Sequence, residues 1–240
     1  MVQTVGAVTM GQTPRDDIVP ELEAALGPGY EIEQVGVLDG LSAAEIEAQS
    51  GRSARGRIVT RLRDGREVRV RHKLVTRRFQ ECVEDLDGRV AMILVLCTGD
   101  LPQVETRVPM LYPGRLLQGL TASLGVERLG VLTPAAGQIR PQRRRWRSAA
   151  RRVFVADVSP YGPPEAFEQA AERLERKRVE VVVLDCIGYT QAMQRRVRDR
   201  LHVPALASLS VLGRIAAEML ASPELDPPQL DATEPTPILR

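Results

Sequence analysis

Short apolar segments that alternate with helical segments constrain the fold of this chain most strongly. Val90–Leu96 and Val179–Asp185 are predominantly apolar along their length and show no regular alternation with polar residues. Such runs are typical of strands that are covered on both faces. Because helical patterns separate these strands, the sequence predicts an α/β fold with parallel sheets.

The first half of the chain begins with a predicted strand at Thr4–Met10, which is followed by signals for a helix. Thr13 is the expected N-cap, Pro14 suits the first helical position, and Asp16 completes a capping pattern. The helical pattern ends near Gly27. Beyond it the sequence predicts a strand at Ile32–Leu38, a short helix capped by Ser42 and Glu45, a β-hairpin of Arg57–Leu62 and Glu67–Val70, a helix over 73–86 and the strand at Val90–Leu96.

The second half of the chain repeats this alternation. Strands are predicted at Arg128–Thr133, Val153–Ser159, Val179–Asp185 and Val203–Leu206. Helices are predicted at Gln138–Arg152, from Pro163 to about Lys177, at Thr190–Leu201 and at Val211–Leu220. The opening strands of the two halves, VGAVT and LGVLT, also match in sequence, as do the later segments LVLCTG and VVLDCIG.

These matches predict two pseudo-symmetric lobes of one fold. The first half is longer than the second by about the length of the hairpin segment, so the hairpin is interpreted as an insertion. The expected organisation is a first lobe over 1–124 with the insertion at about 51–71, a second lobe over 125–221 and a flexible proline-rich tail over 222–240.

Composition excludes several classes of function. The 33 basic and 31 acidic side chains leave a net charge of only +2, and aromatic residues make up 3% of the chain, which argues against a nucleic-acid partner. The longest apolar run is far shorter than the roughly 20 residues that cross a bilayer, so no membrane partner is expected. We expect a cytoplasmic protein, in which the arginine cluster of Arg140–Arg152 belongs to a solvated or oligomer-facing helix.

Two of the three cysteines occupy equivalent positions in the two halves. Cys97 and Cys186 follow predicted strands, and ligands bind beyond the carboxyl ends of parallel strands. Two thiols on opposite sides of a substrate carbon can exchange its proton without a cofactor, provided that the site lowers a thiol pKa, for example by a helix N-terminus. Buried packing is the alternative, and Cys82 is assigned no role. No cofactor is expected, and the lack of metal-ligand spacing predicts no metal site.

Further polar residues follow the predicted strands and are candidates for binding an anionic substrate. Gln12, Thr13 and Arg15 would supply an amide, a helix N-terminus and a guanidinium, although a cap and a solvated arginine are the plainer alternative. Glycines would allow a close backbone approach, and hydroxyl groups would donate hydrogen bonds. The remaining candidates are Thr98, Gly99, Arg115, Thr133, Ser159, Tyr161, Gly188, Tyr189 and Thr190.

Six motifs in order give the chain a family resemblance. They are Met10–Arg15, Leu38–Ser42, Leu96–Gly99, Pro113–Leu116, Ser159–Gly162 and Leu184–Tyr189. Together they resemble the AroM family, which is similar in turn to the aspartate/glutamate/hydantoin racemase superfamily. The resemblance implies two flavodoxin-like lobes with one cysteine from each, Cys97 and Cys186, at the cleft between them. The chain departs from the usual racemase pattern in having Thr98 and Gly99 after the first cysteine and Asp185 before the second.

The expected function is therefore that of a racemase-like protein that binds a small carboxylate between its lobes. We expect a cofactor-independent isomerase or racemase in which Cys97 and Cys186 act as acid and base. A lyase or decarboxylase that uses one cysteine is the nearest variant. The competing class is a non-catalytic binding or regulatory protein linked to aromatic amino-acid metabolism. A homodimer is expected because it is the commonest oligomer.

Overall fold

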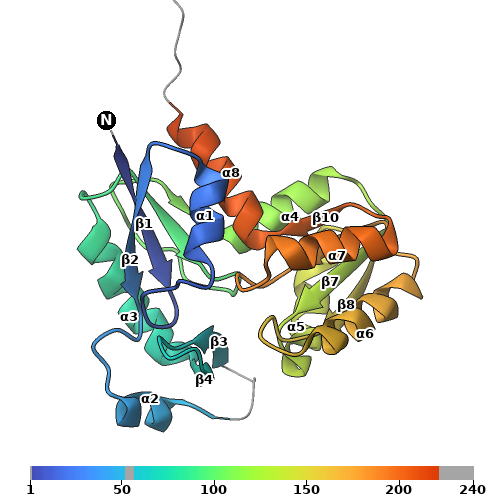
Figure 1. Cartoon of the computed structure of the whole chain (residues 1–240), viewed down its shortest axis with the longest axis horizontal. Helices are drawn as coiled ribbons and strands as arrows, with labels where there is room; N and C mark the ends of the chain where they lie inside the picture. The colour runs from blue at the N-terminus through green and yellow to red at the C-terminus, as the bar shows by residue number, and fades with distance from the viewer. Residues whose placement is uncertain (1, 52–56, 222–240) are drawn as a thin grey trace, which may run out of the picture.

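The computed structural model describes residues 2–51 and 57–221. The predicted tail at 222–240 lies outside the described residues, as do residues 52–56 of the hairpin segment. Two α/β lobes lie side by side, each with a four-stranded parallel sheet (Figure 1). The predicted fold class is confirmed.

The sheet of the first lobe has the strand order β2-β1-β5-β6. Its strands are β1 (Gln3–Thr9), β2 (Tyr30–Gly36), β5 (Met92–Leu96) and β6 (Met110–Leu111). Thr9 pairs with Gly36 on one side and with Leu96 on the other, so the three longer strands end together. This common edge is where Cys97 leaves the sheet.

The sheet of the second lobe has the strand order β8-β7-β9-β10, which matches that of the first lobe strand for strand. Its strands are β7 (Arg128–Thr133), β8 (Arg152–Asp157), β9 (Val181–Leu184) and β10 (Ala205–Ala207). Leu132 pairs with Leu184, and Asp185 and Cys186 follow at the same edge. The two cysteines therefore occupy equivalent places in the two sheets.

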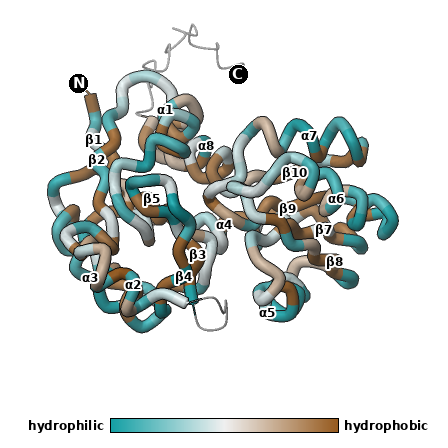
Figure 2. Tube along the Cα trace, turned by 60° about the horizontal axis from the view of Figure 1, so that its bottom comes forward, coloured by the Kyte–Doolittle hydropathy of each residue, from teal (hydrophilic) through white to brown (hydrophobic). Residues whose placement is uncertain are grey.

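Eight α-helices surround the sheets in the described ranges. They are α1 (Val19–Leu26), α2 (Ala43–Gln49), α3 (His72–Leu86), α4 (Pro113–Ser123), α5 (Ile139–Arg145), α6 (Pro164–Glu175), α7 (Gln191–Leu201) and α8 (Ser208–Leu220). Hydrophobic residues concentrate on the strands, whereas the outer helices carry many hydrophilic ones (Figure 2). No described helix combines the length and apolar character that spanning a membrane requires.

Two helix boundaries differ most from the sequence prediction. The helix predicted at Gln138–Arg152 ends at Arg145, because Trp146 turns into the core in a 3-10 turn and the chain then enters β8. Thr13 is not an N-cap: α1 begins at Val19, and the Thr13 hydroxyl donates to Oδ2 of Asp39 at 2.7 Å. The capping box of Ser42 on α2 is confirmed.

Helices α4 and α8 cross between the lobes. Helix α4 follows β6 of the first sheet, yet its Leu117 packs in the second lobe against Trp146. Helix α8 follows β10 of the second sheet, yet Leu209 and Leu212 pack in the first lobe with Leu22 of α1. The boundary expected after residue 124 therefore separates the two halves of the sequence, but it does not separate the two cores. Each half of the chain contributes one helix, α4 or α8, to the core of the other lobe (Figure 1).

The inserted hairpin joins β3 (Arg57–Arg61) to β4 (Glu67–Arg71) in antiparallel pairing. It lies against the loop after β1, where a Cβ added at Gly11 would overlap the carbonyl oxygen of Arg61. It also reaches the second lobe, since the hydroxyl of Ser159 donates to Oε2 of Glu67 at 2.9 Å. The insertion is thus a bridge between the lobes.

Candidate active site

Cys97 and Cys186 line one cavity between the two lobes. The cavity has a volume of about 880 Å³ and is lined by residues of both sheets' carboxyl edges, of the hairpin and of α5. Both cysteines are half-buried. The two cysteines that occupy equivalent positions in the two halves of the sequence thus lie on the wall of the same cavity.

Cys97 is held in a loop that follows β5. The N–H of Gly99 donates to Sγ of Cys97 at 3.3 Å, and a Cβ added at Gly99 would lie only 3.2 Å from that sulfur. Burial raises the pKa of the Cys97 thiol to about 11, against the opposing effects of the Gly99 N–H and the charge of Arg145. No helix begins directly after Cys97, which removes one expected means of lowering this pKa.

Cys186 has an even less ionisable thiol. Burial raises its pKa to about 12, and the nearby groups of Cys97 and Asp185 raise it further. The N–H of Gly188 and the charge of Arg15 act in the opposite direction. With pKa values raised this far, both thiols carry their protons at neutral pH.

Direct hydrogen bonds connect the two cysteine loops. The hydroxyl of Thr98 donates to the carbonyl oxygen of Asp185 at 3.1 Å. Arg145 donates through Nη1 to the carbonyl oxygen of Thr98 at 2.7 Å and lies 3.4 Å from Oδ2 of Asp185. The lobes are therefore joined beside the two thiols, which fixes the position of one loop relative to the other.

Asp185 is a buried carboxyl group beside Cys186. Its Oδ2 accepts a hydrogen bond from the indole N–H of Trp146 at 2.8 Å, whereas its Oδ1 has no hydrogen-bond partner among the described residues. Burial raises the pKa of this carboxyl, although Arg145 favours its ionised form. The sequence placed Asp185 beside the cysteine but could not indicate that Trp146 and Arg145 hold it.

Arg15 lines the cavity but is already paired. Its Nε and Nη2 donate to the carboxylate of Asp17 at 2.8 and 2.9 Å, its Nη1 donates to the hydroxyl of Thr9, and Nη2 also reaches the hydroxyl of Tyr161 at 3.2 Å. Burial opposes ionisation of Asp17, but hydrogen bonds from Arg15 and Arg61 hold its pKa below the usual value. Arg15 therefore ties the lobes together through Tyr161 and contributes positive charge near the thiols.

Arginines of α5 and of the hairpin also line the cavity. They are Arg140, Arg144 and Arg145 of α5, together with Arg57 of β3. The helix of this cluster is solvated as expected, since Arg140, Arg143 and Arg144 are exposed, but three of the cluster's members also line the interlobe cavity. The spacing of Arg140 and Arg144, four residues apart on one helix, was the available signal.

His72 and Gln138 are further lining residues that the sequence analysis did not select for the site. Nε2 of His72 lies 2.9 Å from the carbonyl oxygen of Asp100, which can only accept, so this nitrogen carries a proton. Gln138 accepts a hydrogen bond from the hydroxyl of Thr133 at 2.7 Å. Across residues 2–51 and 57–221, no group of three or more His, Cys, Asp and Glu side chains is placed to hold a metal ion.

Of the predicted binding residues, Arg15, Thr98, Gly99 and Tyr161 line the cavity together with the cysteines. Gln12 and Thr13 instead hold the hairpin, since Oε1 of Gln12 accepts from the N–H of Arg63 and the carbonyl oxygen of Thr13 accepts from its guanidinium. These two residues act on the shape of the cavity through the hairpin and are not part of its wall.

The other predicted binding residues have structural contacts. The hydroxyl of Tyr189 donates to the carbonyl oxygen of Val158 at 2.7 Å inside the second core. Thr190 is the N-cap of α7. Gly188 leaves room for Tyr161, because an added Cβ would lie 2.6 Å from the Tyr161 hydroxyl. Thr133 positions Gln138, and Ser159 binds the hairpin, as described above.

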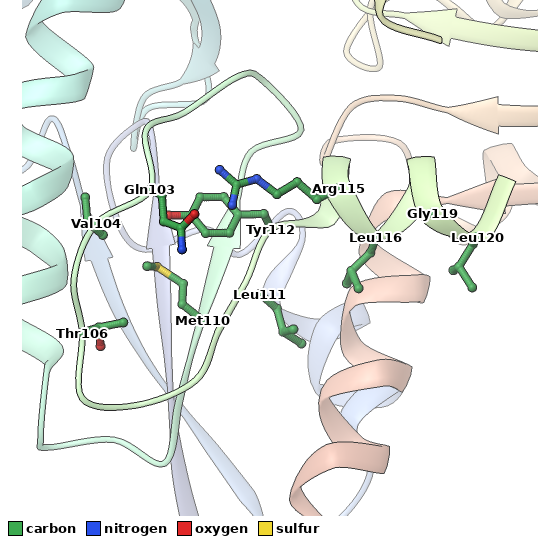
Figure 3. Close-up of a pocket in the computed structure, with 10 residues that line it drawn as sticks. All are labelled: Gln103, Val104, Thr106, Met110, Leu111, Tyr112, Arg115, Leu116, Gly119 and Leu120. Atoms are coloured by element: carbon green, nitrogen blue, oxygen red, sulfur yellow. The ribbon is translucent and has the colours of Figure 1, made fainter. Parts of the chain in front are cut away.

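Arg115 lies in a second, separate pocket of about 530 Å³ at the start of α4. Its guanidinium stacks on the ring of Tyr112, with 4.2 Å between the guanidinium carbon and the ring centroid (Figure 3). Tyr112 in turn donates its hydroxyl to the carbonyl oxygen of Pro102 at 3.0 Å. Strand β6 and helix α4 thus place Arg115, a candidate for binding a carboxylate, in this other pocket and not beside the cysteines.

The two-lobed fold is shared with a class of solved racemases, isomerases and decarboxylases. Maleate isomerase Iso from Pseudomonas putida S16 has a TM-score of 0.62 at 12% identity, covering 92% of this chain and 93% of that chain. Allantoin racemase from Pseudomonas fluorescens has a TM-score of 0.59 at 17% identity, covering 90% of each chain. Unliganded arylmalonate decarboxylase has a TM-score of 0.58 at 15% identity, covering 93% of this chain and 94% of that chain. The fold is thus racemase-like.

The sequence defines the family more narrowly than the fold does. The family described as AroM protein matches residues 5–220, which is nearly all of the part that the structure describes. The chain belongs to the AroM family. No curated protein sequence matches it.

Proposed function

We propose that this protein is a cofactor-independent racemase or isomerase that acts on a small carboxylate between its lobes. Cys97 and Cys186 would serve as the acid and the base. The observation that carries the proposal is that these two thiols, at equivalent strand ends of opposite lobes, line one cavity. The racemase and isomerase folds among the structural neighbours support the same reaction class.

The reaction follows from the two thiols with its protons balanced. One cysteine first gives its proton to a water molecule of the solvent, and the resulting thiolate takes the proton from the carbon next to the substrate carboxylate. The other thiol donates its proton to the opposite face of that carbon. The product then has the opposite configuration, and the two cysteines have exchanged their protonation states.

The charges around the thiols account for how a thiolate is tolerated. Burial keeps both thiols protonated at neutral pH, with pKa values raised to about 11 and about 12. Arg145 and Arg15 favour the ionised forms, and the N–H groups of Gly99 and Gly188 point their positive ends at the sulfurs. These groups stabilise the thiolate once a substrate is in place.

The test is solvent-deuterium incorporation into a panel of chiral carboxylates, followed by NMR. The wild-type protein is expected to exchange the proton on the carbon next to a carboxylate, and Cys97→Ser and Cys186→Ser are each expected to abolish interconversion of the enantiomers. Cys82→Ser is the matched control, because Cys82 packs in the first core on α3 and does not line the cavity. Interconversion of the enantiomers that survives in either single variant, or incorporation that survives when both cysteines are replaced together, would overturn the proposal.

The same variants separate the alternatives. Loss of activity in only one of the two cysteine variants, with release of carbon dioxide or a cleaved product, identifies a one-cysteine decarboxylase or lyase. Binding of carboxylates without any exchange in the wild-type protein identifies a non-catalytic binding or regulatory protein.

A further inference from the structure

The cavity carries more positive charge than one carboxylate requires. Five arginines and two aspartates, Asp100 and Asp185, are among its lining residues. Arg15 is paired with Asp17, and Arg145 with Asp185. The guanidinium groups of the other three arginines make no hydrogen bond or ion pair with any residue that the structure describes; they are Arg57, Arg140 and Arg144.

The stability of α5 does not by itself account for the positions of its two unpaired arginines. Arg140 lies in the first turn, where the helix dipole disfavours a positive charge. Arg144 lies four residues later on the same face, so the two like charges repel each other. The dipole favours the basic residues of the last turn, Arg143, Arg144 and Arg145, but it does not explain why Arg140 and Arg144 line the cavity.

Arg57 is similarly unfavourable for the hairpin that carries it. It pairs directly with Arg71 across the β3–β4 ladder, and like charges in that position destabilise a hairpin. Its Nε is buried and has no hydrogen-bond partner among the described residues. An unpaired buried donor on a cavity wall is satisfied when an anion enters the cavity.

The hairpin and α5 face each other across the space between the lobes in both views (Figures 1 and 2). Arg57 belongs to the hairpin, and Arg140 and Arg144 belong to α5, yet all three line the same cavity. Positive groups gathered from two lobes in a shared, partly enclosed cavity strengthen the local field for anions.

We propose that Arg57, Arg140 and Arg144 form a second anion-binding subsite of this cavity, so that the substrate is a small acid with two anionic groups. One group is the carboxylate next to the reacting carbon, and the other is a carboxylate or a phosphate held by the three arginines. This inference rests on the proposed function for the first group only. The volume of about 880 Å³ accommodates a short chain between the two groups.

The protein contains its own reporter for this subsite. Trp146 is the single tryptophan of the chain, is fully buried, and directly follows Arg144 and Arg145. The guanidinium carbon of Arg145 lies 5.8 Å from the centroid of its ring, and its N–H binds Asp185 on the cavity wall. Its fluorescence therefore reports changes at the arginine-lined side of the cavity.

The experiment titrates the full chain with pairs of acids that differ in one anionic group. The probes are malonate, succinate and glutarate, each with its monoamide, and 3-phosphoglycerate with glycerate. Binding is read by Trp146 fluorescence and, in parallel, by the shift in Tm. At least one doubly charged probe is expected to bind about tenfold more tightly than its singly charged partner, and the two series distinguish a carboxylate from a phosphate as the second group.

Charge-removing variants assign the preference to the subsite. Arg140→Gln, Arg144→Gln and Arg57→Gln are each expected to reduce the preference for the doubly charged probe severalfold, without changing the affinity of its singly charged partner. Arg143→Gln is the matched control on the same helix, because Arg143 is exposed and does not line the cavity. Equal binding of both members of every pair, or equal losses in Arg143→Gln, would overturn the inference.

Failure of this inference is distinguishable from failure of the proposed function. If the two acids of every probe pair bind with equal affinity while deuterium exchange still depends on both cysteines, the inference about the subsite is wrong and the two-thiol reaction stands. If doubly charged acids bind preferentially but no acid exchanges its proton, the subsite stands and the reaction is wrong.

Discussion

At the scale of single residues, desolvation decides the chemistry of the cavity. Burial is the largest cause of the raised pKa values of Cys97 and Cys186, and it outweighs the nearby arginines and backbone N–H groups. A pair of thiols that both keep their protons has an acid but no base. The base form must therefore be generated by the substrate or by alkaline pH.

The raised pKa values of the two thiols predict that the rate of proton exchange depends steeply on pH. The active form carries one thiolate and one thiol, and thiols with pKa values of about 11 and about 12 are protonated below those values. The kcat/KM for proton exchange is therefore expected to rise about tenfold per pH unit from pH 7 to pH 10. Exchange rates measured by NMR across this range check the prediction. A plateau beginning near pH 7 would contradict it.

Asp185 gives a second residue-scale prediction, which concerns stability. Asp185→Ala removes the acceptor of the Trp146 N–H and leaves that donor buried, which is expected to lower the free energy of unfolding by about 1–3 kcal/mol. Asp185→Asn keeps an acceptor for the Trp146 N–H, so it is expected to lower the free energy of unfolding by less than Asp185→Ala does. Urea denaturation of both variants tests this order. An asparagine variant as unstable as the alanine variant would show that the charge, and not the hydrogen bond, is what the site needs.

At the scale of elements, the start of α4 fixes the connection between the cysteine loops. A Cβ added at Gly114 would overlap Nη2 of Arg145 and the carbonyl oxygen of Thr98. These are the two groups whose hydrogen bond joins the lobes beside the thiols. Helix α4 therefore needs a glycine where it passes the site.

We expect Gly114→Ala to lower the free energy of unfolding by about 1–3 kcal/mol and to slow proton exchange, because Arg145 must move. Gly119→Ala on the same helix is the control, since no atom lies within 4 Å of its added Cβ. In an exposed helix position this second change is expected to stabilise by up to about 1 kcal/mol. Thermal unfolding and exchange rates of the two variants are compared, and equal effects would contradict the role given to Gly114.

The elements also show what the sequence could and could not predict. The strands before Cys97 and Cys186 and the hairpin followed from apolar runs and turn residues, which are local signals. Strand β6 has two residues and lies after a long loop, so neither it nor α4 produced a pattern. The direction in which Arg140 and Arg144 face depends on how α5 packs against the sheet, which periodicity alone does not contain. Thr13 matched a capping pattern, but Asp39, distant in sequence, binds it instead.

At the scale of the whole molecule, the exchange of α4 and α8 makes each lobe depend on the other half of the chain. Leu212 of α8 is fully buried in the first core, although it lies late in the sequence. Separating the halves at residue 124 would leave each core without one helix. The cavity between the lobes is thereby built on a shared framework.

Leu212→Ala is accordingly expected to lower the free energy of unfolding by about 2–5 kcal/mol and to reduce hydrogen-exchange protection in β1 and α1. Val197→Ala is the matched change on α7, where Val197 is fully buried in the second core. The Val197→Ala variant is expected to lose hydrogen-exchange protection in β9 and β10. Hydrogen exchange read by mass spectrometry distinguishes the two patterns, and protection lost mainly from the second lobe in Leu212→Ala would contradict the exchange of helices.

The most direct test of the account measures which enantiomer each thiol deprotonates. Both enantiomers of an accepted carboxylate are incubated in deuterated water with Cys97→Ser and with Cys186→Ser, and deuterium incorporation is followed by NMR. The account predicts that each variant retains exchange on one enantiomer only, that the retained enantiomer differs between the variants, and that neither variant racemises. Retention of exchange on the same enantiomer in both variants would contradict the assignment of one thiol to each face of the substrate.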